Sequence, residues 1–266
     1  MKSIRGIVAG LCLVTATSLP AAEMKCNPQA ANSEEYRYTW RLRGGLGWIA
    51  GFVFPRSGFG DLKTLYPPAG QPASAVHSEL LITSDESKNG FYKYESDMEP
   101  DASRTLVTYH GYAWGNKSRK ERTTFDFTKK LARLHKETPA KTEDNVRLLP
   151  SGDVRDVLTA IHYLRTNADR IKGPVTTSIY SDGKEYPVIF RPADPETFTL
   201  DNQRVGTLAF EIVDAPGGKR WPGGVRVWLS DDVRRIPFRI EIVETLASLQ
   251  LDLQSVDACA FMNAKK

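Results

Sequence analysis

Residues 36–43 read Tyr-Arg-Tyr-Thr-Trp-Arg-Leu-Arg, so that large apolar and polar side chains alternate without a break. Successive side chains of a β-strand point to opposite faces of the sheet, and a period of two therefore predicts a strand with one buried face. The same period recurs along most of the chain. This pattern predicts a protein built mainly from antiparallel β-strands.

Turn residues divide the alternating segments from one another. A Gly44-Gly45 turn leads into a second apolar stripe at 46–54, and the stretch from about Pro55 to Ser74, which is rich in proline and glycine, is predicted to be a loop. The remaining strands are expected at 76–83, 91–95, 105–114, 119–128, 131–136, 175–180, 186–191, 205–213, 225–230, 236–243 and 249–253.

The period changes once, after Pro150. From there apolar residues recur at the spacing of one face of a helix, with Ser151 as the expected N-cap and Gly173-Pro174 beyond the end. An amphipathic helix is therefore predicted at about 151–167, between two β halves. The apolar face consists of Val154, Val157, Leu158, Ile161 and Leu164.

The first 22 residues have the pattern of a secretory signal peptide. Lys2 and Arg5 precede an apolar stretch at 6–16, and small residues follow up to Ala22. The competing interpretation is an uncleaved anchor, but a spanning helix needs roughly 20 apolar residues, and this stretch is shorter. We therefore expect a soluble, periplasmic protein without stable membrane insertion after signal cleavage. Its parts are a signal peptide (1–22), an N-terminal segment (23–34), a single β-rich domain (35–258) and a C-terminal tail (259–266).

Two cysteines remain outside the predicted signal, Cys26 and Cys259, at opposite ends of the chain. In an oxidising compartment two such cysteines are expected to pair. A disulfide that closes so long a loop would stabilise the fold by about 5 kcal/mol in the chain-entropy model. The alternative is two free thiols on the terminal segments.

The formal net charge is only +4, which argues against an electrostatic nucleic-acid binder. A local basic cluster is expected to be a solvated strand face, with contacts to phosphate or anionic lipid head groups as the alternative. The cluster consists of Lys117, Arg119, Lys120 and Arg122.

No catalytic or metal-binding motif is visible in the chain. Ser230, Asp231 and Asp232 are adjacent, but no histidine or nucleophile elbow accompanies them, so a hairpin turn explains them. The sequence therefore predicts a protein that is not an enzyme, with no cofactor and no metal site. The histidines have no spacing typical of metal ligands and occur at His77, His110, His135 and His162.

Two stretches resemble a known bacterial family. They are Asp156-Val157-Leu158 through Tyr163-Leu164-Arg165-Thr166 with Gly173, and Val227-Trp228-Leu229-Ser230-Asp231-Asp232 with Arg235-Ile236-Pro237. Together they are similar to the exported-protein family catalogued as domain of unknown function 3108. The resemblance covers most of 35–255, although Ala247 stands where a glycine is expected. It implies a β-rich, periplasmic curved sheet or open β-barrel with a helix packed against it, and no established activity.

A curved sheet with a helix across its opening can enclose an apolar cavity, an outline similar to that of periplasmic lipoprotein carriers. Two hypotheses follow: a carrier of a lipid-like or other apolar envelope component, and a structural or scaffolding envelope protein that acts through protein contacts. In the first, aromatic residues line the cavity; in the second, they fill the core. The candidate lining is Tyr36, Tyr38, Trp40, Trp48, Phe52, Phe54, Tyr109 and Trp228, and the candidate lid residues are Val157, Ile161 and Leu164.

Overall fold

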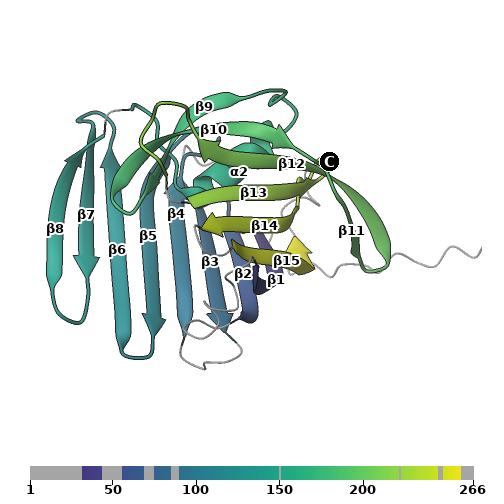
Figure 1. Ribbon diagram of the computed structural model, residues 1–266, viewed down its shortest axis with the longest axis horizontal. Helices are drawn as coiled ribbons and strands as arrows, with labels where there is room; N and C mark the ends of the chain where they lie inside the picture. Colours follow the sequence, from purple (N-terminus) through teal and green to yellow (C-terminus); the bar gives the residue numbers. More distant parts are fainter. Residues whose placement is uncertain are drawn as a thin grey trace, which may run out of the picture.

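The computed structural model describes residues 32–43, 56–68, 75–84, 90–149, 151–221, 223–244 and 248–258. Within these ranges the chain forms fifteen strands and the helix α2 (Val157–Asn167) (Figure 1). The strands are β1 (Ser33–Arg43), β2 (Ser57–Leu65), β3 (Val76–Ser84), β4 (Phe91–Met98), β5 (Thr105–Trp114), β6 (Lys117–Asp126), β7 (Leu131–Glu137), β8 (Thr142–Leu148), β9 (Val175–Ser181), β10 (Lys184–Ala193), β11 (Thr197–Leu200), β12 (Gln203–Asp214), β13 (Gly223–Ser230), β14 (Pro237–Glu244) and β15 (Ser248–Ala258).

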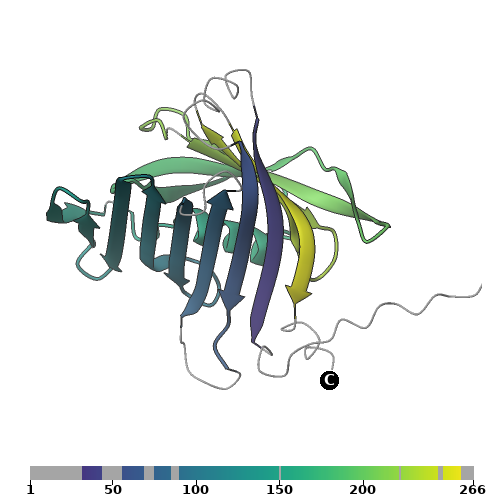
Figure 2. The ribbon, with the colours of Figure 1, turned by 90° about the horizontal axis from the view of Figure 1, so that it is seen from below.

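All the named strands belong to one antiparallel sheet. Its order is β8-β7-β6-β5-β4-β3-β2-β1-β15-β14-β13-β12-β10-β9, with β11 paired to β12. Because β8 and β9 are the two ends of this order, the sheet does not close into a barrel. Figures 1 and 2 show the second half of the sheet crossing over the first, with α2 between them. The predicted fold, a curved antiparallel sheet with one central helix, is confirmed.

The predicted loop at 55–74 is wrong for its first part, because β2 occupies Ser57–Leu65. Glycines at this density predict a turn or loop, but here they make room for neighbouring side chains. A Cβ atom added at Gly58 would lie 2.7 Å from Trp40 Nε1, and one at Gly60 would lie 2.9 Å from a methyl carbon of Leu251. The two glycines therefore let β2 pass close to large residues of the core.

The helix begins six residues later than Ser151, the predicted N-cap. The cap is Asp156, whose carboxylate accepts a hydrogen bond of 2.8 Å from the Thr159 amide. The preceding segment is extended because Arg155 bridges to β9: its amide donates to Ser178 O, and its carbonyl accepts from the Tyr180 amide. The Ser151 hydroxyl instead donates to Asp153 O.

Besides β2, the strands β8 and β11 were not predicted. β8 reads Thr-Glu-Asp-Asn-Val-Arg-Leu and has no buried face, because it is an edge strand held by backbone pairing to β7. β11 has only four residues and pairs with β12 across Asp201 and Asn202, which both have positive φ. Neither strand carries a long apolar alternation for a sequence pattern to detect.

A buried ion pair fixes α2 to the first strand of the sheet. The guanidinium of Arg165 lies 2.9 Å from the carboxylate of Glu34, and both side chains are almost fully buried. Arg165 also donates to the Tyr36 hydroxyl at 3.0 Å and to backbone carbonyls of the turn before β14. Arg165 therefore anchors the helix to the sheet by an ion pair and hydrogen bonds.

His162, on the same helix, is buried and makes a hydrogen bond of 3.1 Å with the Thr64 hydroxyl. Burial, with the nearby charge of Arg165, lowers the pKa of His162 to about 3. Unfolded His162 takes up a proton below its ordinary pKa of about 6.5. The free energy of unfolding therefore decreases as the pH falls from about 6.5 toward the lowered pKa of folded His162, about 3.

We expect the NMR ring signals of His162 to stay constant between about pH 5 and pH 8. The signals of exposed His135 should move with pH, because hydrogen bonds from its ring to Asp144 and Glu137 raise its pKa. A pH titration of the histidine ring resonances tests both expectations. A His162 signal that titrates near the ordinary histidine value would contradict the buried placement.

Several predictions fall on residues outside the described ranges. These are the signal peptide, the strand at 46–54 with Trp48, Phe52 and Phe54, and the disulfide between Cys26 and Cys259. They stay predictions. In the described part of the chain no helix is long and apolar enough to cross a bilayer.

Candidate functional site

A cavity of about 210 Å³ lies between the N-terminal end of α2, the inner face of β3–β6 and the turn that joins β9 to β10. One part of its wall is apolar and the other is polar. The apolar residues are Leu80, Tyr94, Val157, Leu158, Trp221 and Ile242. The polar residues include Thr108, His110, Glu121, Thr123 and Asp182.

The wall of this cavity contains a row of directly paired residues on neighbouring strands. Leu80 on β3 is opposite Tyr94, Tyr94 is opposite His110, and His110 is opposite Glu121 on β6. The row continues from Leu80 in the other direction to Leu62. The inner face therefore changes from apolar near β2 to polar near β6.

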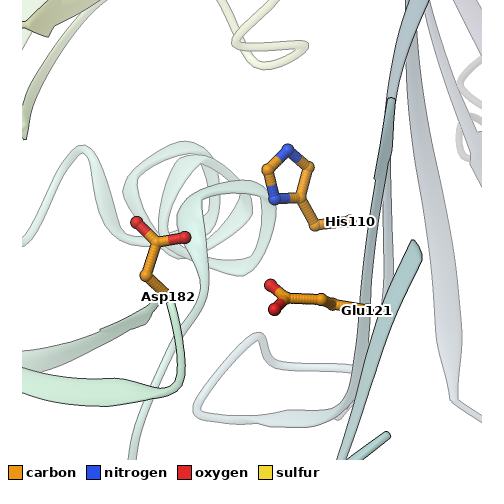
Figure 3. A group of neighbouring side chains, drawn as sticks. All are labelled: His110, Glu121 and Asp182. Carbon is orange, nitrogen blue, oxygen red and sulfur yellow. The ribbon is translucent and has the colours of Figure 1, made fainter. Parts of the chain in front are cut away.

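The polar corner of the cavity brings together three metal-ligating side chains. His110 and Glu121 are cross-strand partners on β5 and β6, whereas Asp182 comes from the β9–β10 turn, where Asp182 and Gly183 both have positive φ. One ligand atom of each residue lies within 4.8 Å of the others. Figure 3 shows one ring nitrogen of His110 pointing toward the two carboxylates.

Two cations neutralise the carboxylates of this corner. Arg119 Nη2 lies 2.6 Å from Glu121 Oε2 and 3.5 Å from Asp182 Oδ1, and Lys136 Nζ lies 3.5 Å from Glu121 Oε1. The predicted solvated face is correct for Lys117, Lys120 and Arg122, which are exposed. It is wrong for Arg119, because alternation along β6 turns Arg119 and Glu121 to the same inner face.

His110 is held as a neutral, stacked ring. Its imidazole lies 4.5 Å from the ring of Tyr94 at an interplanar angle of 9°. Burial lowers the pKa of His110, and Arg119 acts in the same direction, although the nearby carboxylates oppose both. Nε2 of His110 is buried and has no hydrogen-bond partner among the described residues. The ring is therefore an available nitrogen ligand or hydrogen-bonding group at neutral pH.

Tyr180 lines the same cavity and presents a second polar atom whose hydrogen bonding is incomplete. Its side chain is only 5% exposed, and its ring packs edge-on against Phe125 at 4.9 Å. Its hydroxyl interacts with the Thr123 side chain, but among the described residues it makes no hydrogen bond of standard geometry. A buried polar atom without a partner costs about 1–3 kcal/mol, so a bound molecule that satisfies this hydroxyl and His110 Nε2 would regain that energy.

Three of the predicted lining residues are in the packed core instead. Tyr36 and Tyr38 are fully buried and Trp40 nearly so. Their polar atoms are satisfied, because the Tyr38 hydroxyl donates to Pro237 O and Trp40 Nε1 donates to Thr83 O. None of the three lines the cavity.

The other two described lining candidates are also away from the cavity. Tyr109 precedes His110 on β5 and therefore points to the opposite face, where it lines a separate pocket of about 230 Å³ with His77 and Arg122. Trp228 is buried, with the guanidinium of Arg239 5.6 Å from its ring.

The three candidate lid residues have different surroundings. Val157 is half-buried and lines the cavity, whereas Ile161 and Leu164 are buried in the main core. Most of the apolar face of α2 is thus fixed in the core, and only its first turn contacts the cavity. Ser230 belongs to the predicted turn, because its hydroxyl donates to Asp232 and accepts from the Ile236 amide.

The sequence patterns that resemble a known family are supported by a direct match. A model of proteins of unknown function, DUF3108, matches residues 77–254 and thus more than half of the chain. The chain belongs to the DUF3108 family. The matched range includes α2, the cavity wall from β4 to β6 and the β13–β14 turn.

A solved structure resembles this DUF3108 protein in fold. The crystal structure of a β-barrel-like protein of domain of unknown function DUF1849 from Brucella abortus has a TM-score of 0.52 and 10% sequence identity, and the match covers 85% of this chain and 97% of that chain. The lipoprotein LppX from Mycobacterium tuberculosis has 11% identity over 86% of this chain and 88% of its own, but its TM-score of 0.28 is too low to indicate a shared fold. A search of curated proteins found no match.

Proposed function

We propose that this DUF3108 protein is an exported, non-catalytic binding protein of the cell envelope, which holds a small amphipathic molecule or one end of a lipid-like molecule beside α2. The observation that carries this proposal is the cavity, with an apolar wall on one side and, on the other, two polar atoms that make no hydrogen bond of standard geometry among the described residues, His110 Nε2 and the Tyr180 hydroxyl. Ligand sites are typically apolar with a few polar groups that fix orientation.

The size of the cavity limits the ligand. An apolar cavity of roughly 150 Å³ accepts benzene, and pockets for drug-sized molecules have roughly 300–1,000 Å³. At about 210 Å³, this cavity suits a ring or a short segment of an acyl chain, and a whole lipid would have to extend outside it. The polar corner favours a hydrogen-bonding group on the part of the ligand that lies nearest Glu121 and Asp182.

The remaining parts of the proposal rest on the sequence and on local geometry. The pattern of residues 1–22 supports export to the periplasm. The hydroxyl of Ser230 is engaged in the turn with Asp232, which supports a structural role for the one Ser-Asp-Asp cluster of the sequence. We therefore propose binding without chemical conversion of the ligand.

A scaffolding role is the second candidate, and a specific surface favours it. β8 forms one end of the sheet, and its Val146 and Leu148 are 57% and 81% exposed. Unpaired edge strands can accept a strand from a partner protein. If the protein acts by binding an envelope protein at β8, the cavity has no part in its function.

The first experiment is to purify the mature protein from a periplasmic fraction, extract it with organic solvent and compare the extract with a mock purification by mass spectrometry. A stoichiometric amphipathic molecule would support the binding proposal. A clean extract, together with no binding of an added fluorescent probe such as N-phenylnaphthylamine, would contradict it.

Filling the cavity should weaken ligand binding without unfolding the protein. Val157→Phe adds a ring at the half-buried first residue of α2, so we expect the affinity for N-phenylnaphthylamine to fall by about tenfold or more. The matched control is Val233→Phe, the same change at a residue that is 88% exposed, and it should bind the probe like the unaltered protein. Equal affinity in both variants would place the probe elsewhere.

A further inference from the structure

We propose that His110, Glu121 and Asp182 form a binding site for a divalent transition-metal ion, for which zinc is the probe, at the polar corner of the cavity. This site is additional to the proposed binding of an amphipathic ligand and does not depend on it. The three residues come from β5, β6 and the β9–β10 turn, and their ligand atoms already converge (Figure 3).

The donor set has the chemistry of a transition-metal site. It combines one imidazole nitrogen with two carboxylate oxygens, ligands that zinc binds at about 2.0–2.2 Å. Three protein ligands of this kind leave further coordination positions of the metal open. The site borders the cavity, so those positions are available to water or to a polar group of a molecule bound there.

The distances require only a small closure of the site. Ligand atoms around a tetrahedral zinc ion lie about 3.4 Å apart, as follows from the bond lengths above, whereas here they lie within 4.8 Å of one another. Asp182 can provide the movement, because its side chain is 55% exposed on a turn. Glu121 and His110 are cross-strand partners and stay in place.

A buried polar atom in the same cavity is a second indication of a bound species, and either the metal or the amphipathic ligand can satisfy it. The Tyr180 hydroxyl is on a side chain that is only 5% exposed, and among the described residues it has no partner of standard geometry. Tyr180 and its neighbour Thr123 both line the cavity beside Glu121. A water molecule bound to the metal would give this hydroxyl a hydrogen bond of better geometry than its contact with the Thr123 side chain.

Arg119 is the cation that a metal ion would have to replace. Its Nη2 atom bridges Glu121 and Asp182 at 2.6 and 3.5 Å, so the two carboxylates are already arranged around one positive charge. The side chain of Arg119 is 26% exposed, and its buried Nε has no hydrogen-bond partner among the residues that the structure describes. The guanidinium can therefore move toward solvent, and its presence should weaken metal binding rather than prevent it.

The test uses the full mature protein without an affinity tag, treated with a chelator and extracted with solvent before use. Zinc chloride is titrated in by calorimetry, and cobalt(II) is added separately to record its visible absorption. We expect one zinc ion per chain, and cobalt absorption bands typical of a site with nitrogen and oxygen ligands. No saturable zinc binding by the folded protein would overturn the proposal.

Variants locate the bound ion. Asp182→Asn, on the exposed turn, and His110→Gln should each weaken zinc binding by about tenfold or more, since each removes one of three ligands. The matched control is His135→Gln: His135 also contacts two carboxylates, but through opposite ring nitrogens, so these three groups cannot hold one ion. Unchanged affinity in folded Asp182→Asn, or loss in the control alone, would overturn the assignment.

Arg119→Met tests the site in the opposite direction from the ligand variants, because it should strengthen zinc binding. Removal of the guanidinium frees both carboxylates, so zinc should bind several-fold more tightly than to the unaltered protein. Unchanged or weaker binding would mean that the ion does not occupy the position between Glu121 and Asp182, and would also overturn the proposal. Failure of zinc binding leaves the probe-binding experiment with Val157→Phe unaffected, because that experiment uses no metal.

Discussion

Replacement of Arg165 by methionine is expected to lower the free energy of unfolding by about 3–5 kcal/mol, the range for a buried charge that loses its partner. Glu34 is fully buried, and Arg165 lies 2.9 Å from its carboxylate. Methionine fills most of the volume of the arginine stem but leaves that carboxylate without a cation. It also removes hydrogen bonds to the Tyr36 hydroxyl and to the carbonyls of Arg234 and Arg235.

This effect should exceed that of a comparable exposed pair. Arg191 pairs with Glu211 at 2.8 Å, but its side chain is 51% exposed, so Arg191→Met should change stability by about 1 kcal/mol or less. The measurement is urea unfolding of each variant, with the slope compared to exclude a change of the unfolded state.

A double variant separates the lost charge balance from the lost packing. Glu34→Gln combined with Arg165→Met removes both charges, and it should recover part of the stability that Arg165→Met loses, because no unpaired buried charge remains. If the double variant is as unstable as the sum of the two single variants, the two side chains do not act as a pair in the folded protein.

The sequence contained enough information for the fold but for only part of the site. Alternation predicted β5 with its observed bounds. The predicted turn at Gly115 and Asn116 also implies that His110 lies opposite Glu121, because these two residues are equally far from the centre of the turn. Asp182 joins them from a turn more than sixty residues away, a placement that depends on the curvature of the whole sheet and not on any local pattern.

The errors of the sequence analysis have local physical causes. Glycine usually marks a turn, but Gly58 and Gly60 are strand residues that make room for Trp40 and Leu251. Ser151 is a favourable N-cap residue, but backbone bonds between Arg155 and β9 hold the preceding segment extended, so Asp156 takes that role. In both cases a tertiary contact overrides a local preference.

The aromatic stripe shows why the predicted fold did not locate the cavity. Alternation correctly placed Tyr36, Tyr38 and Trp40 on the buried face of β1. A buried face can be packed or can line a space, and the difference depends on what α2 and the second half of the sheet place against it. Here the large side chains meet the core, and the space remains farther along the row, beside the smaller and polar residues of β5 and β6.

The buried N-cap Asp156 should be sensitive both to truncation and to pH. Its carboxylate accepts hydrogen bonds from the Thr159 amide and from the Ser96 hydroxyl, and its own amide donates to Thr105. Asp156→Ala removes the cap and leaves buried donors unsatisfied, so we expect a loss of about 2–4 kcal/mol at neutral pH. Asp153→Ala, in the same segment but 59% exposed, should cost about 0.5 kcal/mol or less.

Asp156→Asn separates the charge from the cap, because asparagine is an equally good N-cap residue. Burial raises the pKa of Asp156, although its hydrogen bonds oppose the shift. Above the ordinary aspartate pKa of about 3.9, the carboxyl of Asp156 ionises in the unfolded chain but stays protonated in the folded protein. The free energy of unfolding therefore falls as the pH rises from this value to the raised pKa of folded Asp156, and this loss persists at higher pH. The asparagine variant should therefore gain stability relative to the unaltered protein between about pH 3.5 and pH 7. Urea unfolding at both pH values measures this difference. If Asp156→Asn instead loses stability relative to the unaltered protein as the pH rises, the buried position stabilises the ionised carboxylate.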